Sequence, residues 1–362
     1  MDNVTHTLFA LTLARTRLGR VGHGATAALV IASNAPDIDF VSAARGGMSY
    51  LTWHRGPTHG LLGAVGLGLM TAAIVWAAGR RRVSRETDPP NASLRSLVAL
   101  SIVGVLGHVL MDLPTSYGTR LLSPFDWRWF AADWLPIVDI YLIVALAAGL
   151  AFGRASLEAR RVNTALVLVL MMTNYGVRGV AHHSALTIAP RLFGPTLPPA
   201  CDGQPAATSL VDRWPRSQVT SRGDGRRCLI EMAAIPSFVS PFRWRVVARL
   251  SNAYEVYNVD LLDRRFWSAP DDSEVFWRRV LRYPNVWTPA VQRAATAPAA
   301  RAFLGFSRFP VVVSAVDPAG TATVRWSDMR FTGGILPAQP APGRQGLFDV
   351  RVRVGADGRI LN

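Results

Sequence analysis

Long apolar runs alternate with short polar segments in the first half of the chain. Four such runs cover residues 61–79, 97–111, 135–152 and 162–180, and the second is the shortest and is interrupted by His108. A helix needs about 20 apolar residues to cross the hydrocarbon core of a bilayer. The pattern therefore predicts four membrane-spanning helices.

Two shorter apolar segments, residues 7–14 and 25–32, precede the first span. Each is too short for a full crossing. Residues 19–24, which contain three glycines, separate them. We expect two short helices that form a hairpin dipping into the bundle.

After residue 183 the sequence pattern changes to Pro-rich loops and strand-like segments. Residues 244–250, 254–261, 309–316 and 322–326 are rich in β-branched and aromatic residues, and residues 272–281 favour a helix. Residues 348–360 resemble a hairpin with an Asp357-Gly358 turn. The predicted fold is an α-helical membrane bundle, with four spanning helices and a short N-terminal helical hairpin, over residues 1–183. A soluble extracytoplasmic α+β domain is expected over residues 184–362.

The formal net charge is +15, and every basic residue is Arg. Clustered cations can indicate nucleic-acid binding. Here, however, many arginines flank the apolar runs, namely Arg80, Arg81, Arg82, Arg85, Arg154, Arg160 and Arg161. Arg-rich loops beside membrane-spanning helices are typically cytoplasmic. We therefore expect no nucleic-acid partner, and a multi-pass protein of the bacterial inner membrane. Residues 40–60, 113–134 and those after about 182 would lie on the outer side.

Only two cysteines occur, Cys201 and Cys228. They are too few for a disulfide scaffold and too isolated for a zinc ribbon. In an extracytoplasmic domain they can form one bridge. Two unrelated thiols are the equally weighted alternative.

Six of the seven histidines lie in segments that the predicted topology brings to the outer face. His108 and Asp112 are spaced i,i+4, which places both side chains on one helical face. Asp37 and Asp39 form a second acidic pair. The predicted metal ligands are His6, Asp39, His54, His59, His108 and Asp112.

Ionisable residues beside a membrane span cost about 2.5–3.5 kcal/mol each on insertion scales, and they tend to mark function. A cation would compensate such a cluster. A His and Asp set without Cys suits zinc, with manganese or iron as alternatives. The competing interpretation is that these residues cap helices or lie at the membrane interface.

Several motifs resemble a known family. They are DNVTH at residues 2–6, PDID at 36–39, HRGPTH at 54–59, GHVLMD at 107–112, PTSYG at 114–118 and SPF at 123–125. Together they resemble the YdjM-like membrane-bound metal-dependent hydrolases, over about residues 1–150. The second half looks like an extension carried by some members, and no activity is attached to it.

The order His, Asp, His and then His-x-x-x-Asp is also remotely similar to that of zinc-dependent phospholipase C and the related single-strand nucleases. This likeness implies metal roles for His6, His108 and Asp112, for an Asp of the 37/39 pair and for a His of the 54/59 pair. The later ligands of those enzymes have no clear counterpart, and Asp133, Asp139 or His182 are candidates to replace them. The number of metal ions stays open.

These observations lead to a functional hypothesis, hydrolysis of a phosphoester in a lipid or lipid-linked substrate, in which a metal-activated water attacks phosphorus. Asp37 or Asp139 would act as the general base, and Arg55 or Arg120 would hold phosphate. The alternative is a non-catalytic metal-binding membrane scaffold or envelope-stress protein. A transporter is disfavoured because the spans are apolar toward the cytoplasmic side. Substrate and oligomeric state cannot be inferred from the sequence.

Overall fold

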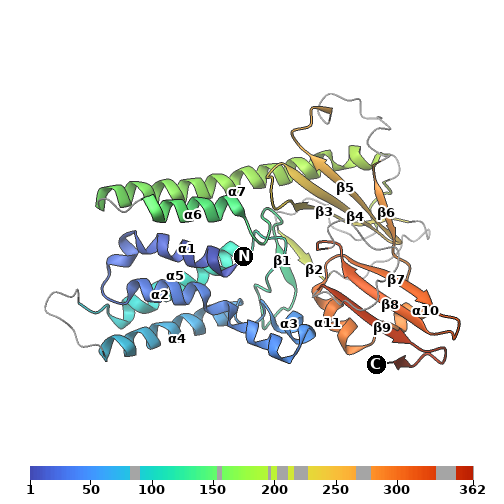
Figure 1. The fold of residues 1–362 in the computed structure, drawn as a ribbon, viewed down its shortest axis with the longest axis horizontal. Coiled ribbons are helices and arrows are strands. Elements are labelled where there is room, and N and C mark those ends of the chain that lie inside the picture. The colour runs from blue at the N-terminus through green and yellow to red at the C-terminus, as the bar shows by residue number, and fades with distance from the viewer. Residues whose placement is uncertain are drawn as a thin grey trace. The chain divides into compact units, whose positions relative to one another are not determined.

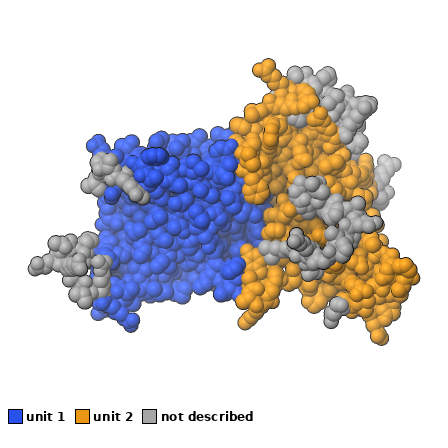
Figure 2. All heavy atoms as spheres, viewed as in Figure 1, with its two compact units in different colours: residues 1–41, 53–180 blue, residues 42–52, 181–362 orange. Residues whose placement is uncertain are grey.

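The computed structural model describes residues 1–81, 90–152, 157–194, 197–201, 211–215, 227–265, 279–331 and 348–361. It comprises two compact units, coloured separately in Figure 2: residues 1–41 with 53–180, and residues 42–52 with 181–362. The expected domain boundary after residue 183 falls inside helix α7 (Leu157–Phe193), which contributes to both units. Three sequence features lie outside the described residues: Arg82 with Arg85, Arg154, and the expected helix 272–281 up to residue 278.

Unit 1 is a bundle of helices (Figure 1). The expected short N-terminal helices are α1 (Asn3–Ala14) and α2 (Ala25–Asn34), joined through η1 (Arg17–Arg20). The 3-10 helix η2 (Ala35–Arg45) follows, and its last residues, together with helix α3 (Gly47–Trp53) up to Thr52, belong to unit 2. The later elements are α4 (Leu61–Arg80), α5 (Leu94–Asp112), β1 (Trp129–Ala131), α6 (Ile140–Phe152) and the first part of α7.

Three of the described helices are long and apolar enough to cross a membrane: α4, α5 and residues 158–193 of α7. The prediction of four spans is not confirmed, because the expected run 135–152 becomes the 13-residue helix α6. At 1.5 Å per residue α6 is about 20 Å long, short of a hydrocarbon core of about 30 Å. Asp139 explains the late start, since its Oδ1 accepts a hydrogen bond from the Leu142 amide at 3.0 Å and so caps the helix.

Helix α5 packs against both α2 and α4. A close approach to α2 is possible because residue 104 is glycine. A Cβ at Gly104 would lie 2.8 Å from the Cβ of Ala32 and 3.0 Å from the carbonyl oxygen of Leu29. Small residues of this kind let membrane helices pack backbone to backbone.

We expect Gly104→Ala to force α5 away from α2 and to destabilise the bundle by about 1–3 kcal/mol, the usual cost of overpacking. Gly66→Ala on α4 is the matched control, because nothing lies within 4 Å of the added Cβ there. Thermal unfolding of both variants in detergent measures the difference. Equal melting temperatures for the two would show that the close approach of α2 and α5 contributes nothing.

Unit 2 contains two four-stranded antiparallel sheets. The first has the order β3 (Leu229–Pro236), β4 (Arg243–Leu250), β5 (Ala253–Asp260) and β6 (Leu281–Pro284). The second has the order β10 (Ile360–Leu361), β9 (Asp349–Val354), β8 (Ala322–Asp328) and β7 (Pro310–Val316). Strand β2 (Asp212–Trp214), helices α10 (Pro289–Ala294) and α11 (Pro298–Phe306), and the last part of α7 also belong to the described part of this unit.

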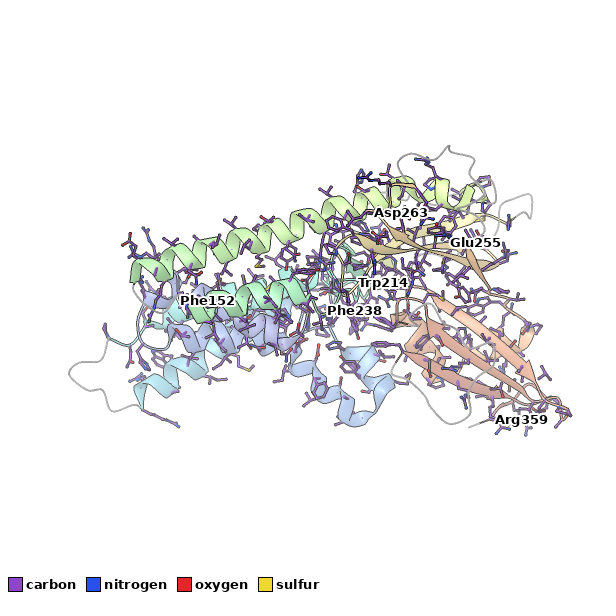
Figure 3. All side chains as sticks on the ribbon, turned by 45° about the horizontal axis from the view of Figure 1, so that its top comes forward. Phe152, Trp214, Phe238, Glu255, Asp263 and Arg359 are labelled. Carbon is purple, nitrogen blue, oxygen red and sulfur yellow. A yellow bond between two sulfur atoms is a disulfide. The ribbon has the colours of Figure 1, made fainter. Side chains whose placement is uncertain are left out.

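The strands expected from sequence are confirmed as β4, β5, β7 and β8, whereas β2, β3 and β6 were not predicted. Leu281, the last residue of the expected helix, instead begins β6. The terminal hairpin is confirmed as well: β9 pairs with β10 across a turn in which Gly358 has φ 78°. Arg359 follows this glycine and is one of the side chains labelled in Figure 3. Cys201 and Cys228 form a disulfide with a Cα–Cα distance of 4.9 Å, which decides between the two alternatives left open by the sequence.

Candidate metal centre

Histidine and aspartate side chains meet where several helices of unit 1 begin or end. Asp112 is the last residue of α5, and His59 precedes the first residue of α4 by two positions. His6 lies in the second turn of α1, whose first turn is capped by the carboxylate of Asp2. The tightly wound η2 carries Asp37 and Asp39.

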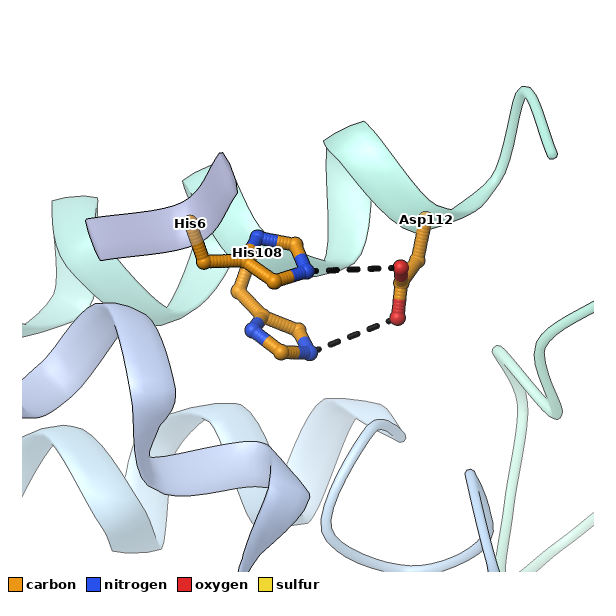
Figure 4. A group of neighbouring side chains, drawn as sticks. All are labelled: His6, His108 and Asp112. Carbon is orange, nitrogen blue, oxygen red and sulfur yellow. Dashed lines mark ion pairs between the residues drawn. The ribbon is translucent and has the colours of Figure 1, made fainter. Parts of the chain in front are cut away.

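The pair on α5 has the geometry that its spacing predicts. His108 Nε2 lies 3.3 Å from Asp112 Oδ2, one turn away on the same helix face. The ring of His6 stacks on that of His108 with centroids 3.8 Å apart. Its Nε2 lies 3.5 Å from Asp112 Oδ1, so both imidazoles face one carboxylate (Figure 4).

Hydrogen bonds at Nδ1 fix which nitrogen of two histidines carries a proton. His108 Nδ1 lies 2.8 Å from the backbone oxygen of Ser33, which can only accept, so His108 donates from Nδ1. His59 Nδ1 lies 3.0 Å from the Thr58 hydroxyl oxygen, whose proton is donated to Asp39. In the neutral rings, the lone pairs are therefore on Nε2. These two Nε2 atoms face each other at 3.1 Å.

Asp37 completes the group around these nitrogens. Its Oδ1 lies 3.5 Å from His59 Nε2 and 3.7 Å from His108 Nε2. Both ring nitrogens of His6 and the Oδ2 atom of Asp112 are buried and have no hydrogen-bond partner among the described residues. Buried polar atoms are rarely left in that state. Two overlapping groups that share His108 could each hold a cation here: His6, His108 and Asp112, and Asp37, His59 and His108.

Asp39 and His54 form an adjoining pair that can also join Asp37 around a cation. His54 Nδ1 lies 2.7 Å from Asp39 Oδ1. The other oxygen, Oδ2, accepts hydrogen bonds from the Arg55 amide and the Thr58 hydroxyl, each at 2.8 Å. Both oxygens of Asp39 are thus already engaged by the chain.

Charge states follow from these contacts. Burial raises the pKa of Asp37 and of Asp39, but contacts with histidines lower it by more. For Asp37 these histidines are His59 and His108. For Asp39 they are His54 and His59. Both pKa values fall well below their usual range. Burial also lowers the pKa of His54, although Asp39 opposes this. Asp37 and Asp39 are therefore charged and His54 is neutral at neutral pH, the forms in which these side chains bind metal ions.

Arg55 is an integral part of the centre. Its backbone adopts φ 52°, and its Nη2 pairs with Asp112 Oδ1 at 3.0 Å while its Nη1 donates to the carbonyl oxygen of Gly118 at 3.1 Å. The amino group of Met1 contacts the same Asp112 oxygen. Arg120 donates its amide to the Arg55 carbonyl oxygen at 3.0 Å, and burial lowers the pKa of its guanidinium to about 10. Both arginines remain charged at neutral pH.

Residues 1–185, just over half of the chain, match the model of the YdjM inner membrane protein family. This chain belongs to that family. Over 163 residues it is also 24% identical to an uncharacterized protein, YfhP, of Bacillus subtilis (strain 168), a stretch covering 43% of this chain and 47% of that protein. The chain thus spans about half the length of this relative. No solved structure matches it.

The whole cluster lies within the region matched by the family model, and the family resemblance noted in the sequence is confirmed. The other candidates from sequence are placed differently. Asp139 pairs with Arg178 Nε at 2.7 Å, and the His182 ring packs against Trp244 with centroids 5.5 Å apart. Among the described residues, neither these two nor Asp133 belongs to a group that could hold a metal ion. Sequence reasoning assigned no role to Ser33, which acts through its backbone oxygen, or to the hydroxyl of Thr58, although Thr58 lies within the HRGPTH motif.

Proposed function

We propose that this protein is a membrane-bound metal-dependent hydrolase that cleaves a phosphoester in a lipid or lipid-linked substrate. One observation supports a bound metal ion. The Nε2 lone pairs of His59 and His108 face each other, with the two nitrogens 3.1 Å apart and carboxylates nearby. Lone pairs at that distance repel unless a cation lies between them. The hydrogen bonds at Nδ1 resemble the outer contacts that orient metal-bound imidazoles in proteins.

The donor set fits a borderline divalent ion such as zinc, manganese or iron, because it combines three imidazoles with two carboxylates and contains no thiolate. When bound, such an ion acidifies water and stabilises charge on phosphoryl oxygens. In this proposal Asp37 joins His6, His59, His108 and Asp112 as a ligand. Its position against two Nε2 atoms supports that role over the base role expected from sequence.

The proton-transfer role falls to His54, oriented by Asp39. A carboxylate that accepts from Nδ1 at 2.7 Å holds the imidazole in one tautomer and stabilises it once protonated. Asp39 suits this task better than metal ligation, because both of its oxygens already accept hydrogen bonds from the chain. Arg55 positions Asp112 and balances its charge. Arg120, next along the backbone hydrogen-bond network, is the remaining candidate for phosphate.

The depth of the centre supports a lipid substrate. Helices α4 and α5 have 20 and 19 residues, so each is about 30 Å long, the thickness of a hydrocarbon core. The centre lies where α4 begins and α5 ends. In this proposal it lies at the level where lipid head groups meet acyl chains.

Orientation follows from the two ends of α4. Arg80 and Arg81 at its far end fit the cytoplasmic side, and the disulfide of unit 2 fits an oxidising compartment. In this proposal the metal centre faces outward, and unit 2 is outside as well, which requires α6 to bring the chain back to the cytoplasmic side between α5 and α7. A membrane-impermeant maleimide applied to intact cells should label Arg45→Cys and spare Arg81→Cys, both of which are exposed. The reverse pattern would invert the topology.

The activity is tested by incubating purified protein, loaded with zinc or manganese, with a panel of phospholipids and lipid-linked phosphates. We expect turnover by wild type and none by His108→Ala. Asp39→Asn should keep the metal and lose about 10²–10⁴-fold in rate, the usual contribution of general acid–base catalysis. Loss of metal from Asp39→Asn would make Asp39 a ligand instead. No turnover by metal-loaded wild type would refute the phosphoesterase and favour the scaffold.

A further inference from the structure

The metal-site carboxylates share their short helix with exposed apolar side chains. In η2, Asp39 is buried, whereas the neighbouring side chains of Ile38, Phe40 and Val41 are 54%, 67% and 68% exposed. In an aqueous setting, three adjacent large apolar side chains of this exposure are unfavourable. The same turn therefore presents polar groups to the centre and apolar groups outward.

A second exposed apolar group combines the loop that covers the start of α4 with the last residue of α3. Phe125 is 78% exposed, and Trp127 and Trp53 are partly exposed and meet edge to face with ring centroids 5.8 Å apart. This loop is fixed at the head of α4, because a Cβ on Gly60 would lie 2.1 Å from the carbonyl oxygen of Ser123. It therefore lies beside His59, one residue before that glycine.

We propose that these six residues form a lipid-inserted rim at the head-group boundary of the bilayer, beside the metal centre. The apolar rim consists of Ile38, Phe40, Val41, Trp53, Phe125 and Trp127. Its occupant is the lipid bilayer rather than a second protein, because the loop packs against Gly60, directly before the spanning helix α4, whose first two residues Leu61 and Leu62 are also exposed. Tryptophan is enriched at this depth in membrane proteins.

The rim has a consequence for the substrate that rests on the proposed function. A lipid held in the outer leaflet would bring its head group to the centre by lateral movement, with its acyl chains still among the other lipids. The rim would then select for substrates presented in a bilayer over dissolved ones.

The depth of the rim can be measured without any activity. Spin labels on Val41→Cys and Phe125→Cys, in the full chain reconstituted in vesicles of phosphatidylethanolamine and phosphatidylglycerol, report collisions with oxygen and with a water-soluble nickel chelate. Val316→Cys on β7 is the matched control, being the same residue type with the same 68% exposure. The native cysteines are paired in a disulfide and do not take the label.

We expect oxygen collisions to exceed nickel collisions several-fold at positions 41 and 125, and the ratio to reverse at 316. Collision rates with the nickel chelate at positions 41 and 125 equal to the rate at position 316 would overturn the proposal of a lipid-inserted rim. Protection from both reagents, or dipolar broadening between labels of two copies, would mean a protein partner and overturn it as well.

An activity measurement separates this proposal from the hydrolase itself. Phe125→Ser should lower turnover of a vesicle-embedded substrate about tenfold while leaving turnover of a short-chain soluble phosphoester unchanged. Equal loss on both substrates would contradict lateral delivery. If wild type hydrolyses nothing while the labels report lipid, the hydrolase fails and the rim stands.

Discussion

The double variant His108→Ala/Asp112→Ala is expected to lose its bound metal. These residues supply an imidazole and a carboxylate, 3.3 Å apart, that face the other donors of the centre. Removing both side chains takes away the ring on which His6 stacks and the only carboxylate that it faces in the described structure. Elemental analysis of purified protein should show the metal content falling to background, while circular dichroism keeps the helical signal.

The matched control is His183→Ala, an exposed histidine on α7 that belongs to none of the metal-capable groups among the described residues. Its metal content should equal that of wild type. Stability gives a second readout, because a ligand that binds only the folded state stabilises it by about 2.7 kcal/mol at a hundredfold excess over its dissociation constant. Added zinc should therefore raise the melting temperature of wild type and leave the double variant unchanged. Equal metal content in wild type and the double variant would contradict the proposed metal centre.

Breaking the ion pair between Asp139 and Arg178 is expected to have the second largest effect. Both side chains are fully buried, and Arg178 Nε lies 2.7 Å from Asp139 Oδ2. Asp139→Asn keeps an oxygen to cap α6 at the Leu142 amide but leaves Arg178 as an uncompensated buried cation. Breaking a buried pair in this way costs about 3–5 kcal/mol.

A double-mutant cycle tests the cause. Asp139→Asn/Arg178→Gln removes both charges and should recover much of the loss, since replacing a whole buried pair is often close to neutral. Arg128→Gln, which removes a partner of Asp126 at the surface, should produce no measurable change. Unfolding in detergent is the measurement. A double variant as unstable as Asp139→Asn alone would show that the cap or the packing, rather than the charge, was lost.

The sequence led to parts of the centre because those parts depend on local geometry. His108 and Asp112 share a helix face by helical periodicity alone, and the structure confirms this. The strands of unit 2 also follow from local composition, with β4, β5, β7 and β8 found where they were expected. The division of roles between Asp37 and Asp39 could not be predicted, because it depends on which of two neighbouring carboxylates faces His59 and His108, residues from other elements.

The expected third span is not confirmed as a full-length helix. Residues 135–152 have the composition of a crossing, yet Asp139 within the run caps α6 and shortens it. Its partner Arg178 lies 39 positions later on α7, a separation that no local pattern bridges. The pairing explains why Asp139, a candidate base from sequence, is engaged away from the metal-capable groups of the described residues.

By itself, the sequence determined that the first half of this protein is a helical membrane region carrying histidines and aspartates at its ends, since apolar run lengths and helical spacing are local properties. Tertiary structure alone decided which of those side chains converge, which tautomers they hold and whether Cys201 reaches Cys228. Such contacts join residues far apart in the chain. They are set by the packing of helices against one another, because burial and hydrogen bonding select one arrangement from many that the same local patterns allow.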